Sequence, residues 1–357
     1  MEKKKLKTCK ACGAEVAKSA KVCPHCGAKI KKPIYQRAWF IVLVVIFLFS
    51  VIGGGSKKNS SDDLKVGEVT PANTQTPENN APIKTENENT KTEYKVGDIL
   101  QDGDMKIVYV ASGNYTSDNQ FSQPAEGNKY IFLKFAFENT GKTDNAISFY
   151  DFECYADGYS TERYYGGGDD LSATLSAGRS TEGYLYFEVP ENAENIEIEY
   201  TTNYFTSKKI NFVYEGEVDS GYELPKNNTA TEGAYKVGDV IEANGITIQY
   251  LACNEYKSSN QFIQPKSGYH FVQIELEFEN TSSSDELVSS VLFNCYADGA
   301  ACNQSYIGDN DLSANISPGR KTKGSIIFEV PNDAEIVEVE FNHNVWTSSK
   351  IVFSVEY

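Results

Sequence analysis

Histidine is scarce in this chain, with three among 357 residues. Hydrolytic sites usually combine a nucleophile with a base and an orienting group, and histidine is the commonest base. His25 lies in a cysteine cluster. The C-terminal part of the chain contains two copies of one sequence, and His270 and His343 of the second copy correspond to Lys129 and Thr202 of the first. A histidine-based active site shared by both copies is therefore excluded, and we expect a protein that is not an enzyme.

Charged residues are absent from residues 38–52, a mostly apolar run that three glycines follow. With its flanks, the run has about the 17 to 20 residues that a helix needs to cross a membrane. Tyr35 and Trp39 lie where interfacial aromatic residues are enriched. A buried soluble helix and a cleaved signal peptide are the alternatives, but the run has no polar face and a long basic region precedes it. The sequence predicts a transmembrane helix over residues 34–55.

Basic residues gather before this run. Residues 1–37 carry eleven lysines and arginines against Glu2 and Glu15, although the whole chain has a net charge of −17. The positive-inside rule therefore predicts a single-pass protein of the cell membrane, with a cytoplasmic N-terminus and extracellular C-terminal domains. The same lysines would attract nucleic-acid phosphates, but they equally suit an anionic cytoplasmic leaflet. No arginine or aromatic platform for reading bases accompanies them, so we expect no nucleic-acid partner.

Aromatic residues are absent from residues 53–93, which are rich in Ser, Asn, Thr, Pro and Glu. A segment of this composition cannot bury enough apolar area to fold. As a flexible coil it would span about 35 Å. We predict a disordered stalk over residues 56–93.

Two Cys-x-x-Cys-Gly motifs lie near the N-terminus, within residues 1–33. Thiolates from two such turns suit tetrahedral zinc, and a site filled by four sulfur ligands is structural because no position stays open for water. Disulfides and a redox motif are the alternatives, and His25 could replace a cysteine as ligand. The paired motifs resemble the short zinc ribbons at the N-termini of many bacterial membrane proteins. The predicted ligands of this cytoplasmic zinc ribbon are Cys9, Cys12, Cys23 and Cys26.

The C-terminal part of the chain, from residue 94 onward, is a tandem duplication without insertion or deletion. The sequence Tyr-Lys-Val-Gly-Asp occurs at 94–98 and 235–239, and Cys-Tyr-Ala-Asp-Gly at 154–158 and 295–299, so the two copies are related by a constant shift of 141 residues. This period is far longer than that of solenoid repeats, so each copy should be a domain with its own core. We name residues 94–215 repeat 1 and residues 235–357 repeat 2, with a linker over 216–234.

Both repeats alternate apolar and polar residues with a period of two, which predicts strands with one face in water. The residues predicted to face inward are Ile131, Leu133, Phe135, Phe137, Ile196, Ile198 and Tyr200 in repeat 1, and Val272, Ile274, Leu276, Phe278, Val337, Val339 and Phe341 in repeat 2. Glu197, Glu199, Glu338 and Glu340 are predicted to face solvent. Asp-Gly and Asn-Gly dipeptides mark tight turns, and no long amphipathic helix is found. The fold class is therefore mainly β, with two tandem immunoglobulin-like β-sandwiches after a small zinc ribbon and one transmembrane helix.

The repeats also resemble a known family. Segments 127–132, 137–141, 175–179 and 183–190 of repeat 1, and the matching segments 268–281, 316–320 and 324–331 of repeat 2, are similar to the DUF4352-type domain. The resemblance implies an immunoglobulin-like sandwich on the outer face of a Gram-positive bacterium. It implies no activity and no catalytic residues.

One loop in each repeat is a candidate site. It precedes an Asp-Leu-Ser-Ala motif and offers Tyr165, Asp169 and Asp170 in repeat 1, and Tyr306, Asp309 and Asp311 in repeat 2. Clustered oxygen atoms on a glycine-rich loop could bind calcium, and the tyrosines could instead stack on a sugar or a protein partner. Neither loop matches an EF-hand. A flexible surface loop without a ligand is the alternative.

The remaining cysteines differ between the repeats. Cys154 and Cys295 occupy matching strand positions and are predicted to be small buried apolar residues. Cys253 and Cys302 occur only in repeat 2 and could form a disulfide outside the cell, although sequence cannot supply the Cα separation that decides it.

These features predict a membrane-anchored surface protein with a structural zinc ribbon inside the cell and two extracellular β-sandwiches that bind an unknown protein or glycan. Tandem domains would add avidity. The alternative is an envelope-sensing signalling or regulatory component that acts through the ribbon. The sequence leaves the ligand and the oligomeric state open.

Overall fold

The computed structural model describes residues 6–8, 15–17, 65–68, 93–204, 206–308, 310–344 and 349–356. Contacts divide the chain into two units, Met1–Ser61 and Asp62–Tyr357, and the second unit holds both repeats. In the first unit, β1 (Leu6–Thr8) pairs with β2 (Glu15–Ala17). The four cysteines of the predicted zinc ribbon, the predicted transmembrane helix and most of the predicted stalk lie outside the described residues. The described part of the chain contains no helix long and apolar enough to span a membrane.

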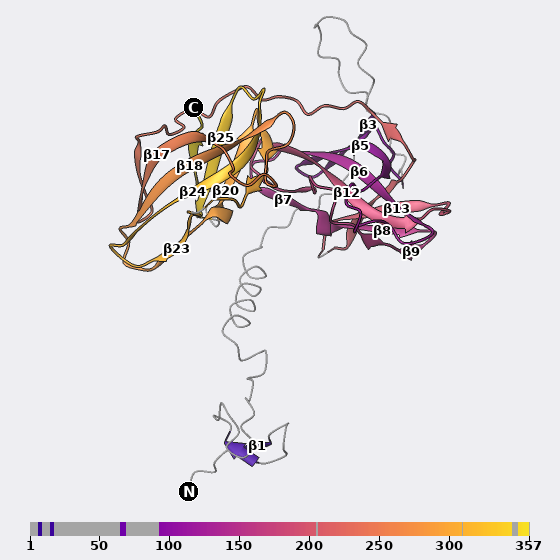
Figure 1. Cartoon of the computed structure of the whole chain (residues 1–357), viewed down its shortest axis with the longest axis horizontal. Coiled ribbons are helices and arrows are strands. Elements are labelled where there is room, and N and C mark those ends of the chain that lie inside the picture. The colour runs from indigo at the N-terminus through magenta and orange to yellow at the C-terminus, as the bar shows by residue number, and fades with distance from the viewer. Residues whose placement is uncertain are drawn as a thin grey trace, which may run out of the picture. The chain divides into compact units, whose positions relative to one another are not determined.

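Repeat 1 is built from two sheets whose strands pair antiparallel within the repeat (Figure 1). The first sheet contains β4 (Asp98–Asp102), β5 (Met105–Tyr115), β6 (Asn128–Asn139) and β12 (Ser180–Pro190), with β10 (Glu162–Arg163) on β12. The second runs in the order β14 (Lys208–Val213), β13 (Ile196–Asn203), β8 (Phe152–Ala156), β9 (Tyr159–Ser160). A small pair, β7 (Asn145–Ser148) with β11 (Ser172–Leu175), and a 3-10 turn at Phe149–Asp151 complete it. At the edge, β3 (Lys65–Glu68) pairs with β4.

Repeat 2 has the same arrangement. Its first sheet is β16 (Val240–Ala243), β17 (Ile246–Tyr256), β18 (Tyr269–Asn280), β24 (Lys321–Pro331) and β22 (Gln304–Ser305). Its second is β26 (Ser349–Ser354), β25 (Val337–Asn344), β20 (Phe293–Ala297) and β21 (Ala300–Cys302). The small pair is β19 (Glu286–Ser289) with β23 (Ser313–Ile316), and a 3-10 turn spans Ser290–Leu292.

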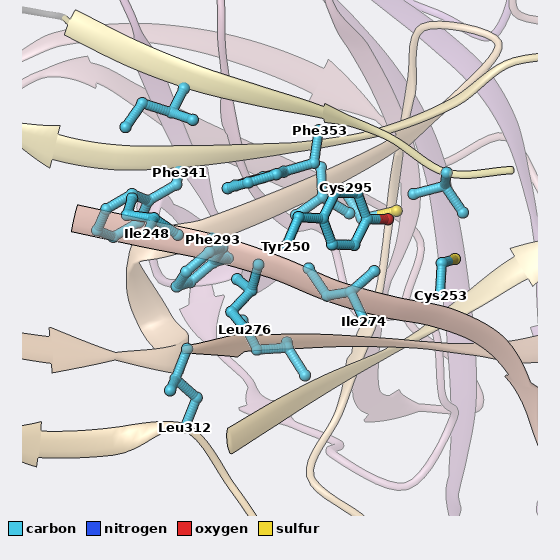
Figure 2. Packing of buried hydrophobic residues seen from close by; sticks show 14 of the residues in the cluster. Ile248, Tyr250, Cys253, Ile274, Leu276, Phe293, Cys295, Leu312, Phe341 and Phe353 are labelled. Carbon is cyan, nitrogen blue, oxygen red and sulfur yellow. The ribbon is translucent and has the colours of Figure 1, made fainter. Parts of the chain in front are cut away.

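Each repeat has a hydrophobic core between its sheets, as the alternation predicts. The inward-facing residues named above are all buried, with 7% exposure or less. Figure 2 shows the repeat 2 core, where Tyr250, Ile274 and Phe353 from three strands converge. The predicted β-sandwich fold is therefore confirmed by the structure.

The connecting segment, residues 216–234, contacts both repeats. Within it, β15 (Val218–Asp219) pairs with β5, and Tyr222 and Leu224 pack on a small apolar cluster of repeat 1. Farther along, the Asn227 N–H donates to the carbonyl of Asp298 at 2.7 Å, and Lys226 pairs with Asp333 at 2.9 Å. The segment thus contacts first repeat 1 and then repeat 2.

The repeats also contact each other directly. Ser180 of β12 bridges in parallel to Ala300 of β21, and the Ser180 N–H donates to the Gly299 carbonyl at 3.0 Å. The Tyr296 ring belongs to the core of repeat 1 although it is a repeat 2 residue, and its hydroxyl donates to the Thr174 carbonyl at 2.7 Å. The interface therefore joins a sheet of repeat 1 to a sheet of repeat 2, and the core of repeat 1 includes an aromatic side chain from repeat 2.

An ion cluster lies at this interface, and it corrects one expectation. Glu338 and Glu340, predicted to face solvent, are 1% and 3% exposed because repeat 1 covers them. Arg179 lies 2.5 Å from Glu338 and 3.0 Å from Glu340. Lys350 pairs with Glu340 at 3.1 Å. In repeat 1, where no repeat covers the same face, Glu197 is exposed and Glu199 half-buried.

Candidate functional site

A cleft of 570 Å³ lies between the repeats. We call it the inter-repeat cleft. Repeat 1 contributes β12 and the loop before the Asp-Leu-Ser-Ala motif, the connecting segment contributes residues 222–226, and repeat 2 contributes β21, β22 and β24. Its charged and aromatic lining comprises Lys134, Asp169, Asp170, Glu182, Tyr184, Tyr222, Glu223, Lys226, Lys266, Tyr269, Phe293, Asp298, Tyr306, Phe328, Glu329 and Asp333.

Lys266 connects the charged groups of the two repeats across the cleft. Its ammonium group pairs with Asp169 of repeat 1 and, at 3.2 Å, with Glu329 of repeat 2. It also lies 5.2 Å from the centre of the Tyr269 ring. Burial alone would lower the pKa of Lys266, but the two carboxylates outweigh burial and raise it. Lys266 therefore stays charged at neutral pH and holds the rim of the cleft together.

A second pair lies on the wall that repeat 1 provides. Lys134 on β6 pairs with Glu182 on β12 at 2.8 Å and lies 5.8 Å from the centre of the Tyr184 ring. Two opposed charges beside an aromatic ring offer hydrogen bonds and a flat apolar surface together. Such a wall suits a polar ligand with apolar faces.

The cleft gathers three of the predicted loop residues. Asp169, Asp170 and Tyr306 line it, although they come from different repeats. Tyr306 is 67% exposed and available to a ligand. Burial raises the pKa of the Asp170 carboxyl, and the nearby Arg163 opposes that effect.

Tyr165 and Asp311 do not line the cleft. Tyr165 is 60% exposed and packs edge-on against Phe149, with ring centres 6.1 Å apart. Asp311 is exposed and bridges to Ser325. Asp309 lies outside the described residues. The two loops are therefore not equivalent halves of one site.

Packing explains why the Asp-Leu-Ser-Ala motif occurs in both repeats. Leu171 and Leu312 are 0% and 1% exposed, and the segment crosses a glycine of the neighbouring strand. A Cβ added to Gly183 would lie 2.7 Å from the Cα of Leu171, and one added to Gly324 would lie 2.8 Å from the Cα of Leu312. The motif is thus held by close backbone contact.

Metal binding stays a prediction. Among the described residues no group of three or more His, Cys, Asp or Glu side chains is placed to hold an ion. Of the calcium candidates, Asp169 is paired with Lys266. The predicted zinc ligands Cys9, Cys12, Cys23 and Cys26 lie outside the described residues.

The cysteines of repeat 2 lie in an arrangement that the sequence did not indicate. Cys253 and Cys302 are both free thiols in the structure. Cys302 faces Cys295 across the β20–β21 pair. Cys154 and Cys295 are buried, as predicted.

Sequence reasoning missed Lys266, Tyr269 and the buried ion cluster. One signal was available, because Lys266 and Tyr269 replace Ala125 and Asn128 of repeat 1 at a shift of 141. These two residues of the cleft therefore differ from their counterparts in the other repeat.

Several solved structures are similar to part of this chain. The ycdA protein from Bacillus subtilis is 20% identical, with a TM-score of 0.26, over 31% of this chain and 36% of its own length. A β-sandwich protein from Clostridium difficile is 14% identical, with a TM-score of 0.24, over 36% of this chain and 99% of its own. The secreted protein MPT63 from Mycobacterium tuberculosis is 12% identical, with a TM-score of 0.26, over 34% of this chain and 95% of its own.

No curated protein matches the chain. The model of the family described as "Domain of unknown function (DUF4352)" matches residues 94–210 and 235–351, which are most of both repeats. These two matches cover more than half of the chain. The chain therefore belongs to the DUF4352 family, with two tandem domains.

Proposed function

We propose that this chain is a surface protein, anchored by a single transmembrane helix, that binds an extracellular glycan in the inter-repeat cleft and catalyses no reaction. The observation that carries the proposal is the cleft itself, with its tyrosines and paired charges. Sugars present apolar ring faces and many hydroxyls, which suit tyrosine rings beside carboxylates and lysines.

Substitution of Tyr306 tests the glycan site. Tyr306→Ala should weaken binding of the full chain to soluble envelope glycan fragments about tenfold, since an exposed aromatic ring is an energetic anchor of binding surfaces. Tyr159→Ala is the matched control, because Tyr159 is 80% exposed and lies outside the cleft. Calorimetric titration measures both. Absence of binding by the wild-type chain, or equal binding by both variants, would refute the glycan site.

The cytoplasmic end is proposed to be a structural zinc ribbon. Its support is the pair of Cys-x-x-Cys-Gly motifs, whose four thiolates leave no open position on the ion. Metal analysis of the purified full chain should find one zinc per chain, and a Cys12→Ser/Cys26→Ser variant should lose it. A wild-type chain free of zinc would rule out the ribbon.

The orientation in the membrane has its own test. Protease added to intact cells should remove residues 94–357 and spare the N-terminus, because the lysines before the apolar run favour the cytoplasmic side. An antibody tag at each end distinguishes the fragments. Protection of the C-terminal tag in intact cells would reverse the proposed topology.

A further inference from the structure

The contact between the repeats joins two different surfaces. Repeat 1 provides a loop, residues 174–180, which we call the arginine loop. Repeat 2 provides the outer face of β20, β25 and β26, which we call the acidic face. Arg179 donates to Glu338 at 2.5 Å and to Glu340 at 3.1 Å. Such a contact is heterologous, because each side uses a surface that the other does not.

Further contacts show how completely the two surfaces match. Ser176 donates to Glu340 and accepts from Lys350. The Arg179 guanidinium lies 4.6 Å from the centre of the Tyr296 ring. Burial alone would lower the pKa of Arg179, but the two glutamates outweigh burial and raise it. The arginine loop thus supplies a cation and a hydroxyl to a face that supplies two carboxylates and an aromatic ring.

The duplication gives each surface a counterpart, and no described residue of the other repeat covers it. In repeat 2, the loop over residues 315–321 keeps Ser317 and Arg320 at the positions of Ser176 and Arg179, and both side chains are exposed. In the part of the chain that the structure describes, Arg320 has no ion-pair partner. Its covered counterpart Arg179 has two.

The acidic face has its counterpart on repeat 1. Glu197, Glu199, Tyr155 and Lys209 stand at the positions of Glu338, Glu340, Tyr296 and Lys350. Glu197 is exposed, and the Glu199 side chain is 27% exposed, against 4% for Glu340. Among the described residues, repeat 1 therefore carries an acidic face that the other repeat does not cover, on which Glu199 pairs with Lys209. Repeat 2 carries an uncovered arginine loop.

We propose that copies of this chain assemble head to tail, with Arg320 of one copy on the Glu197 and Glu199 face of the next. The contact repeats, between molecules, the one that joins the repeats within each molecule. Since each chain keeps one free loop and one free acidic face, the association continues along a row or closes into a ring.

Two substitutions make the contact between copies differ from the one within a chain. Within the chain, the small side chains of Ser180 and Ala300 allow the backbone bridge. The matching positions in the other repeat, which would meet between copies, hold Lys321 and Tyr159. These long side chains keep the two backbones apart, so the contact depends on side-chain charges. It also lacks the covalent link that gives the repeats a high effective concentration. The assembly is therefore reversible and weakens with added salt.

Charge reversal tests the assembly. The wild-type full chain in detergent micelles should show a mass that rises with concentration, measured by light scattering with the detergent contribution subtracted. Arg320→Glu should weaken the association about a hundredfold, because like charges then meet. Lys257→Glu is the matched control, since it makes the same charge change at an exposed site of repeat 2 outside the loop.

A pair of variants decides the partner surface. Glu197→Lys/Glu199→Lys should also stay monomeric alone, and mixing it with Arg320→Glu should restore assembly, because each loop then meets a face of opposite charge. All three positions are at the surface of repeat folds whose cores are untouched. A wild-type chain that stays monomeric, an Arg320→Glu variant that assembles normally, or a mixture that stays monomeric would each overturn the proposal.

Discussion

Burial controls the ionisation of several side chains in repeat 1. Cys154 is 0% exposed, and burial raises the pKa of its thiol from 9.0 to about 11. Burial likewise raises the pKa of Tyr214 to about 12. The folded state therefore favours the neutral form of both groups, and deprotonation at alkaline pH opposes folding.

Cys154 predicts an alkaline loss of stability. A group with a raised folded pKa stabilises the fold fully below its unfolded pKa and loses that effect as pH rises through its folded pKa. The thiol's contribution should thus be constant below pH ~9 and fall by up to about 3 kcal/mol by pH ~11. Urea unfolding of the wild type and Cys154→Ala at pH 7 to 11 measures it. The difference between the two proteins should shrink across that range, and a constant difference would contradict the prediction.

At the scale of the element, one buried asparagine ends the same strand in each repeat. Asn139 closes β6, donating to the carbonyls of Thr143 at 2.7 Å and Leu175 at 2.8 Å. Asn280 closes β18, donating to Ser284 and Ile316, both at 2.7 Å. The sequence Phe-Glu-Asn-Thr occurs at 137–140 and again at 278–281. Its asparagine connects the strand end to the following loop and to the neighbouring small strand pair.

Replacing either asparagine should destabilise its own repeat. Asn139→Leu removes the side-chain donor from the buried Leu175 carbonyl, and Asn280→Leu removes it from the buried Ile316 carbonyl. Each change should cost about 1–3 kcal/mol in the free energy of unfolding. Asn254→Leu on β17 is the control, because its side chain is exposed. Denaturant unfolding monitored by tyrosine fluorescence compares the three. Equal stability of all three variants would show that the asparagine contacts contribute nothing.

Cross-strand charges show what the duplication preserves. Lys134 and Glu182 pair at 2.8 Å in repeat 1, and the same two positions hold Glu275 and Lys323, which pair at 3.3 Å in repeat 2. The sign at each position is exchanged while the pair is kept. The geometry of the β6–β12 and β18–β24 pairs therefore favours opposite charges there, whichever strand carries the cation.

Sequence predicted the elements well because strand periodicity is local. The alternation in β6, β13, β18 and β25 identified the buried side chains without any knowledge of the tertiary structure. It could not distinguish Glu338 from Glu197, since both lie between apolar residues of the same pattern. Their different burial comes from the arginine loop of the other repeat. The cleft was only partly predictable for the same reason: Asp169 and Tyr306 were candidates, whereas Lys266 gains its role from contacts 97 residues away in sequence.

At the scale of the whole molecule, one ion cluster joins the repeats. Arg179 and Lys350 face Glu338 and Glu340, and Lys350 also pairs with Asp144 at 2.7 Å. Buried charges are costly unless each has a partner. The cluster therefore requires both repeats to be in place, and it makes the orientation of the repeats specific.

Removal of Arg179 should uncouple the repeats. Arg179→Met leaves Glu338 without its ion-pair partner at the interface, and breaking a buried pair in this way costs about 3–5 kcal/mol. The loss falls on the contact and not on either core, so calorimetry of the dilute full chain should show two separate transitions where the wild type shows one. Arg320→Met is the control, because the same residue at the same position of repeat 2 is exposed and should change stability by less than about 0.5 kcal/mol. If Arg179→Met melts in a single transition at the wild-type temperature, the cluster does not hold the repeats together. Their contact then depends on Tyr296, the Ser180–Gly299 backbone bond, the Asp169–Lys266 pair and the connecting segment.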